Sequence, residues 1–452
     1  MGSTRRDIKV DYLARVEGEG ALDLAILDGQ LGDIRLAIFE PPRLFEAFLV
    51  GRTYDEVPDM TARVCGICPV AYQMSSVHAA EQAFGARVEG QLRKLRRLMY
   101  CGEWLESHLL HIFMLHGPDF LGYESVIAMA RDYPDLVRTG LWMKRVGNDI
   151  VVAMGGREIH PVSVRVGGFY RILTKGELTP LLPRLREAKS KAIDTAKWAA
   201  SLNFPDFTRE AECLSLSHPD EYPMNEGRIV SNKGLNITAS EFLDHIVEKQ
   251  VPYSTALQYY VKGRGPFFAG PLARVNLNFE KLTPDAQEVA KRSGISFPSS
   301  NPFHSILARA LEVIHCFDEA ASIIENYEEP PVPYVPPQPK ASTGAAITEA
   351  PRGMLFHRYE YDSEGHVISA NLIPPTSMNQ RQIEQDLREY LPRFLHLPTD
   401  QVAFRAETAV RNYDPCISCS SHSIKLRMTF DPQSGRDFRS EISDCKCDGM
   451  PH

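Results

Sequence analysis

Two Cys-x-x-Cys pairs constrain this chain more than any other feature. Cys65 and Cys68 lie in RVCGICPV, and Cys416 and Cys419 lie in DPCISCSSH near the other end of the 452 residues. A pair separated by two residues projects both sulfurs toward one point, so four thiolates can hold one soft metal centre. The pairs of a zinc ribbon usually lie about 15 to 20 residues apart. Here positions 69–415 separate the pairs, so we expect a metal clasp that joins the two ends of one large domain.

Composition indicates a globular protein able to bury a large core. The chain is 43% hydrophobic and 24% charged, and its formal net charge of -8 gives no basic surface for nucleic acid. No stretch approaches the roughly 18 apolar residues of a membrane-spanning helix, and the start has no signal-peptide core. Nine cysteines, an odd number, fit a reducing compartment better than a disulfide framework. We expect a cytoplasmic protein, with an export signal on a partner as the alternative.

Hydrophobic periodicity predicts an α+β fold: a mainly helical core bundle with a small N-terminal antiparallel sheet and peripheral hairpins. Residues 8–60 alternate apolar and polar positions, which is typical of a small sheet. A helical core is expected over 69–327, beginning with two long helices directly after the first cysteine pair. Further helices are predicted at 178–202, 239–262 and 303–327, which favour a buried bundle.

The C-terminal part, 341–422, follows a proline-rich segment. Residues 328–340 contain too many prolines for a helix or a central strand and predict an extended linker. A hairpin with a turn at DSEG is expected next, and then a helix at about 378–394. Residues 423–452 are polar and predict an appendage beyond the clasp.

Cysteine spacing alone does not name the metal. Thiolates select zinc, copper, nickel or iron in clusters, and tetrahedral zinc is the commonest use of two such pairs. Five signatures in order then resemble the large, catalytic subunit of nickel-iron hydrogenases: ARVEGEG, RVCGIC, GGREIHPVSVRVGG, TEAPRG and DPCISCSSH. The resemblance covers about residues 8–422 and implies one catalytic domain over 1–422. The sequence around the cysteines is most similar to the cytoplasmic branch of the family, whose members couple hydrogen to NAD(P) through partner subunits.

The resemblance implies a role for each cysteine. Cys65 and Cys416 would be terminal nickel ligands, while Cys68 and Cys419 would bridge nickel to an iron that carries carbon monoxide and cyanide. Thiolates can bridge two soft metals, and an unfilled metal position leaves room for hydrogen. A closed zinc site would leave the flanking signatures without a use.

Further residues match the family's proton carrier and its polar surroundings. Glu17, in RVEG, matches the first proton carrier, beside a bridging cysteine; the alternative is a solvated surface charge. Arg352 matches the arginine over the open metal position, with Pro351 shaping the adjoining backbone, and its alternative is an ordinary ion-paired arginine. Asp414 is the natural partner for that guanidinium, or else a turn residue. Thr376 matches the hydroxyl that hydrogen-bonds a cyanide.

The family also holds a magnesium ion near the active site. The matching residues are Glu46, the backbone carbonyl near Leu372, and His422. Oxygen ligands suit magnesium, although a histidine nitrogen is less typical, and Glu46 alone would equally fit one face of an amphipathic helix. Ser107 is a departure, because other members have an acidic residue there, so the polar network around Arg352 should differ. The neighbouring histidines His108 and His111 are expected to be packed or capping residues.

Partners follow from what the chain lacks. The five other cysteines are mostly scattered, so iron-sulfur clusters must lie on a small iron-sulfur subunit. No glycine-rich dinucleotide fingerprint follows a strand, so an NAD(P) site would belong to flavin- and NAD(P)-binding diaphorase subunits. The resemblance also implies nickel-insertion chaperones and a maturation protease that removes 423–452 after His422, so the printed chain looks like a precursor.

Two alternatives from other classes stay open at this point. One is a non-catalytic scaffold related to the quinone-reducing subunit of respiratory complex I, against which the retention of four cysteines argues. The other is a structural zinc protein. Nickel and iron in equal amounts would support the hydrogenase, zinc alone the second alternative, and no metal the first.

Overall fold

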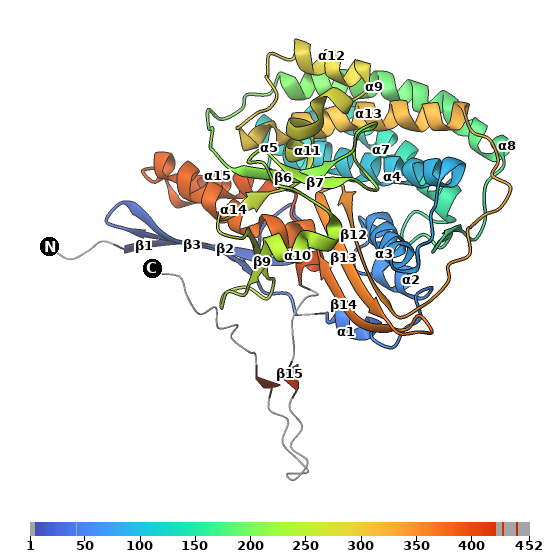
Figure 1. Ribbon diagram of the computed structural model, residues 1–452. Helices are drawn as coiled ribbons and strands as arrows, with labels where there is room; N and C mark the ends of the chain where they lie inside the picture. The colour runs from blue at the N-terminus through green and yellow to red at the C-terminus, as the bar shows by residue number, and fades with distance from the viewer. Residues whose placement is uncertain (1–4, 42, 422–426, 429–439, 442–452) are drawn as a thin grey trace, which may run out of the picture.

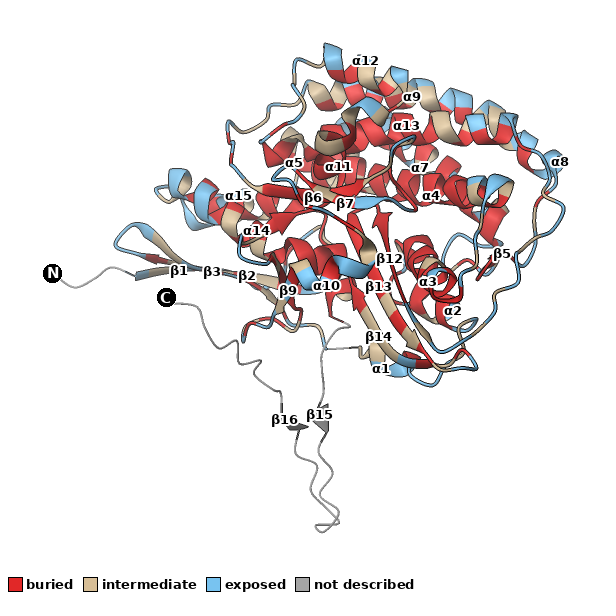
Figure 2. Cartoon of the chain, viewed as in Figure 1, coloured by how far each residue is buried: buried red, intermediate tan, exposed pale blue. Residues whose placement is uncertain are grey.

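Four long helices pack together in the upper part of the molecule as Figure 1 draws it. They are α4 (Gly90–Leu110), α7 (Pro134–Gly155), α9 (Leu182–Ala200) and α13 (Ser305–Glu325). In this computed structural model, which describes residues 5–41, 43–421, 427–428 and 440–441, α4 packs against α7 and α13, and α13 packs against α9. Figure 2 shows buried residues along much of α4 and α13. The expected α+β fold with a helical core is confirmed, as are the helices predicted at 178–202 and 303–327.

Proline and glycine mark the ends of two long helices, of which only the first was predicted from the sequence as a separate helix. The helix α3 (Pro69–Phe84) begins with proline and ends at Gly85, whose φ is 71°. The helix α7 begins at Pro134 and ends at Gly156, whose φ is 81°. Proline at the first helical position loses no intrahelical hydrogen bond, and glycine adopts the left-handed cap without a steric cost. The two long helices predicted directly after the first cysteine pair correspond to α3 and α4.

The helices α4 and α7 approach closely at two glycines. A methyl group on Gly147 would lie 2.8 Å from the Cβ atom of Leu105 and 3.0 Å from the carbonyl oxygen of Gly102. A methyl group on Gly102 would lie 2.8 Å from a methyl group of Val151. Neither helix leaves room for a side chain at the crossing, so the glycines set the spacing of the two helices.

The N-terminal sheet is shorter than the predicted range 8–60. It contains β1 (Arg5–Val10), β2 (Gly20–Leu27) and β3 (Gln30–Ile38), which pair antiparallel in that order. The chain then forms α1 (Phe45–Leu49) and α2 (Val57–Ala62). Pro41 lacks the amide hydrogen that a continuing ladder needs, and Pro58 suits the first turn of a helix. The alternating pattern was correct for β2 but extended too far along the chain.

The helix predicted at 239–262 was wrong. Its helical part is a 3-10 turn (Ala239–Glu241) followed by the single turn of α10 (Phe242–His245), and β9 (Ile246–Lys249) and β10 (Gln258–Val261) then pair antiparallel. Pro252 interrupts the helical pattern between the two strands, and tyrosines at 259 and 260 favour a strand. Tertiary pairing therefore overrides the apolar periodicity.

The expected helical core also contains small sheets that the sequence analysis did not predict. A four-stranded sheet has the order β11-β6-β7-β8, and β4 pairs with β5. The strands are β4 (Val164–Arg165), β5 (Gly168–Phe169), β6 (Glu212–Ser217), β7 (Arg228–Ser231), β8 (Asn236–Ile237) and β11 (Phe267–Phe268). Runs of two to six residues are too short to give a periodic signal.

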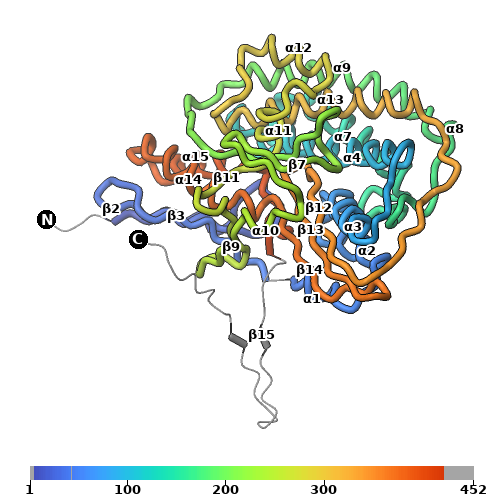
Figure 3. Tube along the Cα trace, viewed as in Figure 1, coloured from blue at the N-terminus to red at the C-terminus, as the bar shows by residue number. Residues whose placement is uncertain are grey.

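The C-terminal part contains the predicted hairpin and helix. The strands β12 (Ser342–Ala350), β13 (Gly353–Tyr361) and β14 (Val367–Ile373) form an antiparallel sheet, and α3 packs on β12 and β13. The DSEG turn joins β13 to β14. The helix predicted at about 378–394 is α14 (Pro375–Tyr390). Figure 3 shows α14 near the N-terminal sheet, where it contacts β3, so an early and a late segment of the described chain meet there.

The proline-rich segment 328–340 has no helix and packs against the domain as an extended strap. The amide of Phe169 donates to the carbonyl oxygen of Pro333 over 2.9 Å, and the amide of Val335 donates to Gly167 over 2.8 Å. The remaining α-helices and strands are α5 (Gly117–Leu121), α6 (Val126–Asp132), α8 (Lys175–Leu178), α11 (Pro271–Asn278), α12 (Pro284–Arg292), α15 (Thr399–Arg411), α16 (Ile417–Ser420), β15 (Arg427–Met428) and β16 (Ser440–Glu441).

Apart from β15 and β16, the predicted appendage 423–452 lies outside the described residues. Within the described part of the chain, no helix combines the length and the apolar character needed to cross a membrane.

We predict that Gly147→Ala lowers the stability of the fold. The overpacked crossing should cost about 1–3 kcal/mol, more than the gain of up to about 1 kcal/mol from the better helix propensity of alanine. The urea midpoint of the variant should fall. The control is Gly176→Ala in α8, where the nearest atom lies 3.9 Å from the added methyl group, and it should leave the midpoint unchanged or higher. An unchanged midpoint for Gly147→Ala would contradict the close-packing argument.

Candidate metal centre

Four buried cysteine sulfurs converge from the two ends of the chain. Cys65, Cys68, Cys416 and Cys419 each place Sγ within 4.8 Å of the other three. The Sγ atoms of Cys65 and Cys416 are 3.5 Å apart, and those of Cys68 and Cys419 are 3.9 Å apart. Each residue is at most 4% exposed. The predicted clasp is therefore present in the fold.

Each cysteine pair lies beside the start of a helix. Cys68 immediately precedes α3, and Cys416 immediately precedes α16. The amides of Ile67 and Cys68 both donate to Cys65 Sγ over 3.3 Å. Such amide donors, together with the N-terminal end of the helix dipole, stabilise a thiolate. Of the first pair, Cys65 is thus prepared to bind as an anion.

Glu103, on α4, completes the support of the first pair. Its carboxylate accepts from the amides of Val70 over 2.6 Å and Ala71 over 3.1 Å, at the open start of α3. Burial, and then the charge of Glu106, raise the pKa of Glu103 well above its usual range. We did not single out Glu103 from the sequence. The available sequence signal was a glutamate within an apolar-rich helix. That pattern does not predict which amides the carboxylate binds.

Backbone pairing fixes the N-terminal segment to the second cysteine pair. The amide of Glu17 donates to the carbonyl oxygen of Pro415 over 3.3 Å, and the amide of Ile417 donates to Glu17 over 2.8 Å. These two bonds form a parallel bridge between Glu17 and Cys416. The ARVEGEG signature is therefore held directly against the DPCISC signature.

The Glu17 carboxylate lies against a cysteine sulfur. Cys416 Sγ donates to Oε2 over 3.0 Å, and the amide of Ser418 donates to the same oxygen over 3.1 Å. The side chain is partly buried. The contact is with the cysteine that the resemblance makes a terminal ligand, so the expectation of a bridging cysteine at this point was wrong. The backbone bridge between Glu17 and Cys416 explains the difference.

Arg352 and Asp414 form the predicted ion pair. Arg352 Nε donates to the backbone carbonyl oxygen of Asp414 over 2.7 Å and lies 3.0 Å from its carboxylate, and Nη2 donates to the carboxylate over 3.2 Å. Both residues are 2% exposed. Asp414 has a φ of 51°, which turns the chain just before Cys416. Nη1 of Arg352 has no hydrogen-bond partner within the described part of the structure.

Opposing effects set the charge of this pair. Burial alone would lower the pKa of Arg352, but Asp414 and the sulfurs of Cys416, Cys68 and Cys65 raise it well above its usual value. Burial raises the pKa of Asp414, and Arg352 opposes that rise. A guanidinium so close to thiols stays charged. It therefore places a fixed positive charge beside the sulfur cluster.

Thr376 and Ser107 complete the polar surroundings. Thr376, in the first turn of α14, is 3% exposed, and its hydroxyl oxygen accepts the amide of Cys416 over 2.9 Å. The hydroxyl of Ser107 is buried without a hydrogen-bond partner among the residues described. His108 contacts Glu312, and His111 contacts the carbonyl oxygen of Arg411, so both histidines bond to other parts of the fold.

The structure brings together two of the three residues of the predicted magnesium site. The amide of Leu372 donates to Glu46 Oε1 over 2.7 Å, and the side-chain amide of Asn371 donates to the same oxygen over 3.3 Å. His422 lies outside the described residues. The magnesium site stays a prediction.

The donor set fits a soft metal centre. Four thiols in a buried space are costly to ionise without a metal, and burial raises the pKa of Cys416 well above its usual range. A bound cation reverses this effect, because it coordinates the deprotonated form. Four thiolates within bridging distance of one another suit one or two soft metals.

Comparison with known proteins identifies the family. A model described as "Nickel-dependent hydrogenase" matches residues 43–139. The sulfhydrogenase 2 subunit alpha of Pyrococcus furiosus is 33% identical over 422 residues, which cover 93% of this chain and 100% of that protein. The chain belongs to the nickel-dependent hydrogenase family.

Two further hydrogenases extend the likeness along the whole domain. The NAD-reducing hydrogenase HoxS subunit beta of Cupriavidus necator is 26% identical over 466 residues, covering 93% of this chain and 95% of that one. A crystal structure of an NAD+-reducing NiFe-hydrogenase in the H2-reduced state matches with a TM-score of 0.84 at 28% identity, covering 93% of this chain and 100% of that one. Together with the four convergent cysteines, these matches make this hydrogenase chain the catalytic subunit, as predicted.

We predict that Cys68→Ser and Cys419→Ser each remove most of the bound nickel and reduce hydrogen turnover to the background, because a hydroxyl is a poor ligand for a soft metal. Nickel per chain is measured by elemental analysis of purified enzyme. Cys213→Ser is the control, since Cys213 is 2% exposed but lies outside the cluster. Full nickel and activity in Cys68→Ser would contradict the assignment.

Proposed function

We propose that this hydrogenase chain carries out the reversible heterolytic oxidation of hydrogen at a nickel-iron centre whose iron carries carbon monoxide and cyanide. The observation that carries the proposal is the convergence of four buried sulfurs beside a carboxylate and a fixed guanidinium. When bound, such a centre supplies the electrophile that polarises hydrogen and takes up its electrons. Cys65 and Cys416 would be terminal ligands, and Cys68 and Cys419 would bridge the metals.

Glu17 receives the proton in this proposal. Its Oε2 atom lies 3.0 Å from Cys416 Sγ, which is within reach for a direct proton transfer. The Ser418 amide holds the same oxygen in place. Because the side chain is only partly buried, the carboxyl lies between the dry sulfur cluster and the exterior. It is therefore suited to carry protons out during oxidation and in during hydrogen production.

Arg352 and Thr376 fix the electrostatics and geometry of the open side. The Asp414 carboxylate and carbonyl hold the Arg352 guanidinium, leaving Nη1 for a group at the centre. The Thr376 hydroxyl accepts the Cys416 amide, and its own proton can be donated to a cyanide on the iron. These buried groups stabilise charge without having to reorganise.

We predict that Glu17→Gln lowers kcat for hydrogen oxidation by about 10²-fold or more, because an amide cannot accept the proton. Nickel and iron content should stay unchanged. The assay is dye reduction under hydrogen at several pH values. Glu19→Gln is the matched control, two residues away with an exposed side chain, and it should retain activity. Loss of less than about threefold in Glu17→Gln would exclude Glu17 as the main proton carrier.

Composition of the centre is tested directly on purified enzyme. Nickel and iron in equal amounts, with infrared bands of carbon monoxide and cyanide on iron, are expected. A sample that is active with zinc alone, or without the infrared bands, would overturn the proposed centre.

Electrons would leave through partner subunits. Among the described residues, Cys101, Cys213 and Cys316 are buried and lie outside the sulfur cluster, so this part of the chain offers no iron-sulfur relay. We propose a small iron-sulfur subunit as the direct partner, with flavin- and NAD(P)-binding diaphorase subunits as the acceptor module. The likeness to NAD-reducing hydrogenases supports NAD(P) as the final acceptor.

Processing completes the proposal. A maturation protease would cleave after His422 once chaperones have inserted nickel, and a magnesium ion would then bind at Glu46, the Leu372 backbone and His422. We predict that active enzyme lacks residues 423–452. Intact-protein mass spectrometry of active enzyme decides this, and a full-length mass would reject the cleavage.

A further inference from the structure

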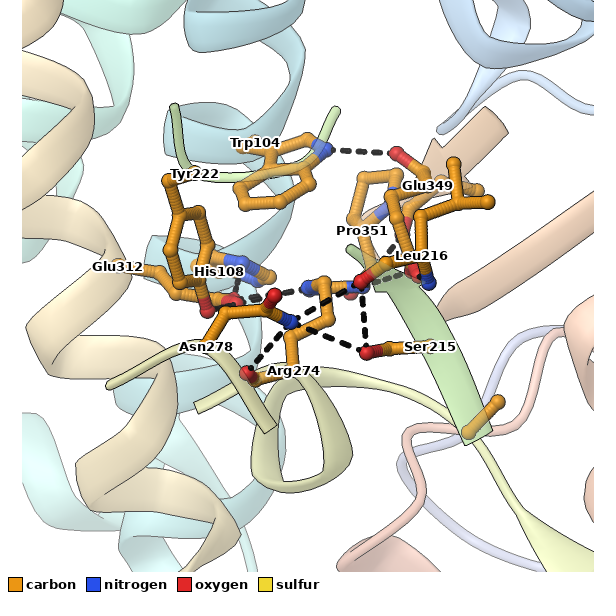
Figure 4. Close-up of polar contacts among 12 residues, drawn as sticks. Trp104, His108, Ser215, Leu216, Tyr222, Arg274, Asn278, Glu312, Glu349 and Pro351 are labelled. Atoms are coloured by element: carbon orange, nitrogen blue, oxygen red, sulfur yellow. Dashed lines mark hydrogen bonds and ion pairs between the residues drawn. The ribbon is translucent and has the colours of Figure 1, made fainter. Parts of the chain in front are cut away.

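A second polar network contacts the segment that leads into Arg352. Its centre is Arg274, in α11, which is fully buried (Figure 4). The guanidinium pairs with Glu312 on α13 through two bonds of 2.7 and 2.8 Å, and with Glu349 on β12 over 3.0 Å. Its Cζ atom lies 4.2 Å from the centre of the Trp104 ring. Four elements therefore meet at one side chain.

The same guanidinium binds the backbone that leads into Arg352. Nη1 donates to the carbonyl oxygen of Ala350 over 2.9 Å, and Nη2 donates to that of Pro351 over 2.8 Å. These are the two residues immediately before Arg352. Because both acceptors are backbone atoms, the bonds fix the path of the chain itself.

Neighbouring contacts leave this segment little freedom. The carbonyl oxygen of Arg352 lies 2.8 Å from where a methyl group on Gly270 would be, so the two backbones touch. The amide of Arg274 donates to the carbonyl oxygen of Gly270 over 2.9 Å. Gly353 has a φ of 137° and packs on the amide of Gly270. A shift at the start of α11 would therefore move Arg352.

Arg274 and Glu312 form a buried charged pair, whereas Glu349 is the member of the network that can titrate near neutral pH. Burial would raise the pKa of Glu312, but Arg274 outweighs burial and holds it below the usual range. Burial raises the pKa of Glu349 to about 7, against the effect of Arg274. His108 Nε2 and the Tyr222 hydroxyl also contact the two carboxylate oxygens of Glu312, over 2.8 and 2.7 Å. A dry, paired network of this kind keeps one geometry.

Asn278 and Glu349 connect the network to the neighbouring strand β6 and to Trp104. Asn278 Nδ2 donates to the Ser215 hydroxyl and to the Leu216 carbonyl oxygen, which attaches the end of α11 to β6. The amide of Leu216 donates to Glu349 over 2.7 Å. The Trp104 indole donates to the Glu349 carbonyl oxygen over 3.0 Å.

We propose that Arg274 is a positioning residue for the catalytic centre: its bonds to the carbonyl oxygens of Ala350 and Pro351 hold the backbone that places the Arg352 guanidinium beside the four cysteines. The inference rests on the proposed role of Arg352. The hydrogen-bond and ion-pair partners of the Arg274 guanidinium are Glu312, Glu349 and the two backbone carbonyl oxygens, so it acts through Arg352 rather than on hydrogen. A lysine cannot replace it, because one ammonium group cannot serve two carboxylates and two carbonyl oxygens in a plane.

The test uses Arg274→Lys in the assembled, metal-loaded enzyme. We expect kcat for hydrogen oxidation to fall about 10- to 100-fold, as for a small displacement of a catalytic group. KM for hydrogen and the nickel and iron content should stay close to those of the native enzyme. Hydrogen-deuterium exchange in a peptide covering 349–354 should become faster, which gives a readout independent of turnover.

Arg96→Lys is the matched control. Arg96, on α4, is fully buried and forms a two-bond pair with Glu81 over 2.6 and 2.8 Å, but it does not bind the segment before Arg352. Its substitution should lower thermal stability comparably while leaving kcat and the exchange of peptide 349–354 unchanged. If both variants lose kcat to the same extent, Arg274 has only a general structural role and the proposal falls.

A double-mutant cycle separates this inference from the proposed function. If Arg274 acts through Arg352, then Arg274→Lys should cost much less in an Arg352→Lys background than in the native enzyme. Losses that multiply would overturn the positioning role while leaving Arg352 as a catalytic residue. Loss of nickel with activity in Arg274→Lys would also overturn it. Full kcat in Arg352→Lys alone would instead reject the proposed function of Arg352, and the inference with it.

Discussion

The structure depends on bringing the two ends of the chain together at four sulfur atoms. Closing a loop of this length costs about 5 kcal/mol of chain entropy, before any metal contributes. Backbone bonds between Glu17 and the segment around Cys416 offset part of that cost, and so does the packing of α14 on the N-terminal sheet. The sulfur cluster is therefore built by the fold.

Buried charge around the centre occurs in pairs that each fix one segment. Arg352 is held by Asp414, and Arg274 is held by Glu312 and Glu349. Removing one member of such a pair leaves an uncompensated buried charge, which is more costly than never having buried the pair. The pairs consequently define position better than they increase stability. That is useful around a reaction centre, where an arginine must stay within a fraction of an ångström of its place.

Much of the fold and the cluster could be predicted from the sequence, but the supporting network could not. The helices α3, α9, α13 and α14 could be predicted from helical periodicity, and α3, α9 and α14 also have a proline in the first turn. The sequence signatures marked the cysteines. The segment 239–262 was mistaken for a helix because two of its parts pair with each other as strands, which only the tertiary structure decides. Arg274 was missed because no feature of the sequence around it indicates that its guanidinium binds the backbone of Ala350 and Pro351. The partner of Glu17 was also misassigned, because strand register next to Cys416 selects it.

The separation of the two cysteine pairs has a consequence for how the protein is made. A ribosome that adds about 5 to 20 residues per second needs on the order of 20 to 70 seconds to extend the nascent polypeptide from Cys68 to Cys416. During that time the first pair is already outside or leaving the exit tunnel without its counterpart. Nothing in the N-terminal half alone can bury those two thiols with their proper neighbours. Biosynthesis therefore imposes an interval in which half a site must be shielded from adventitious metals and oxidants.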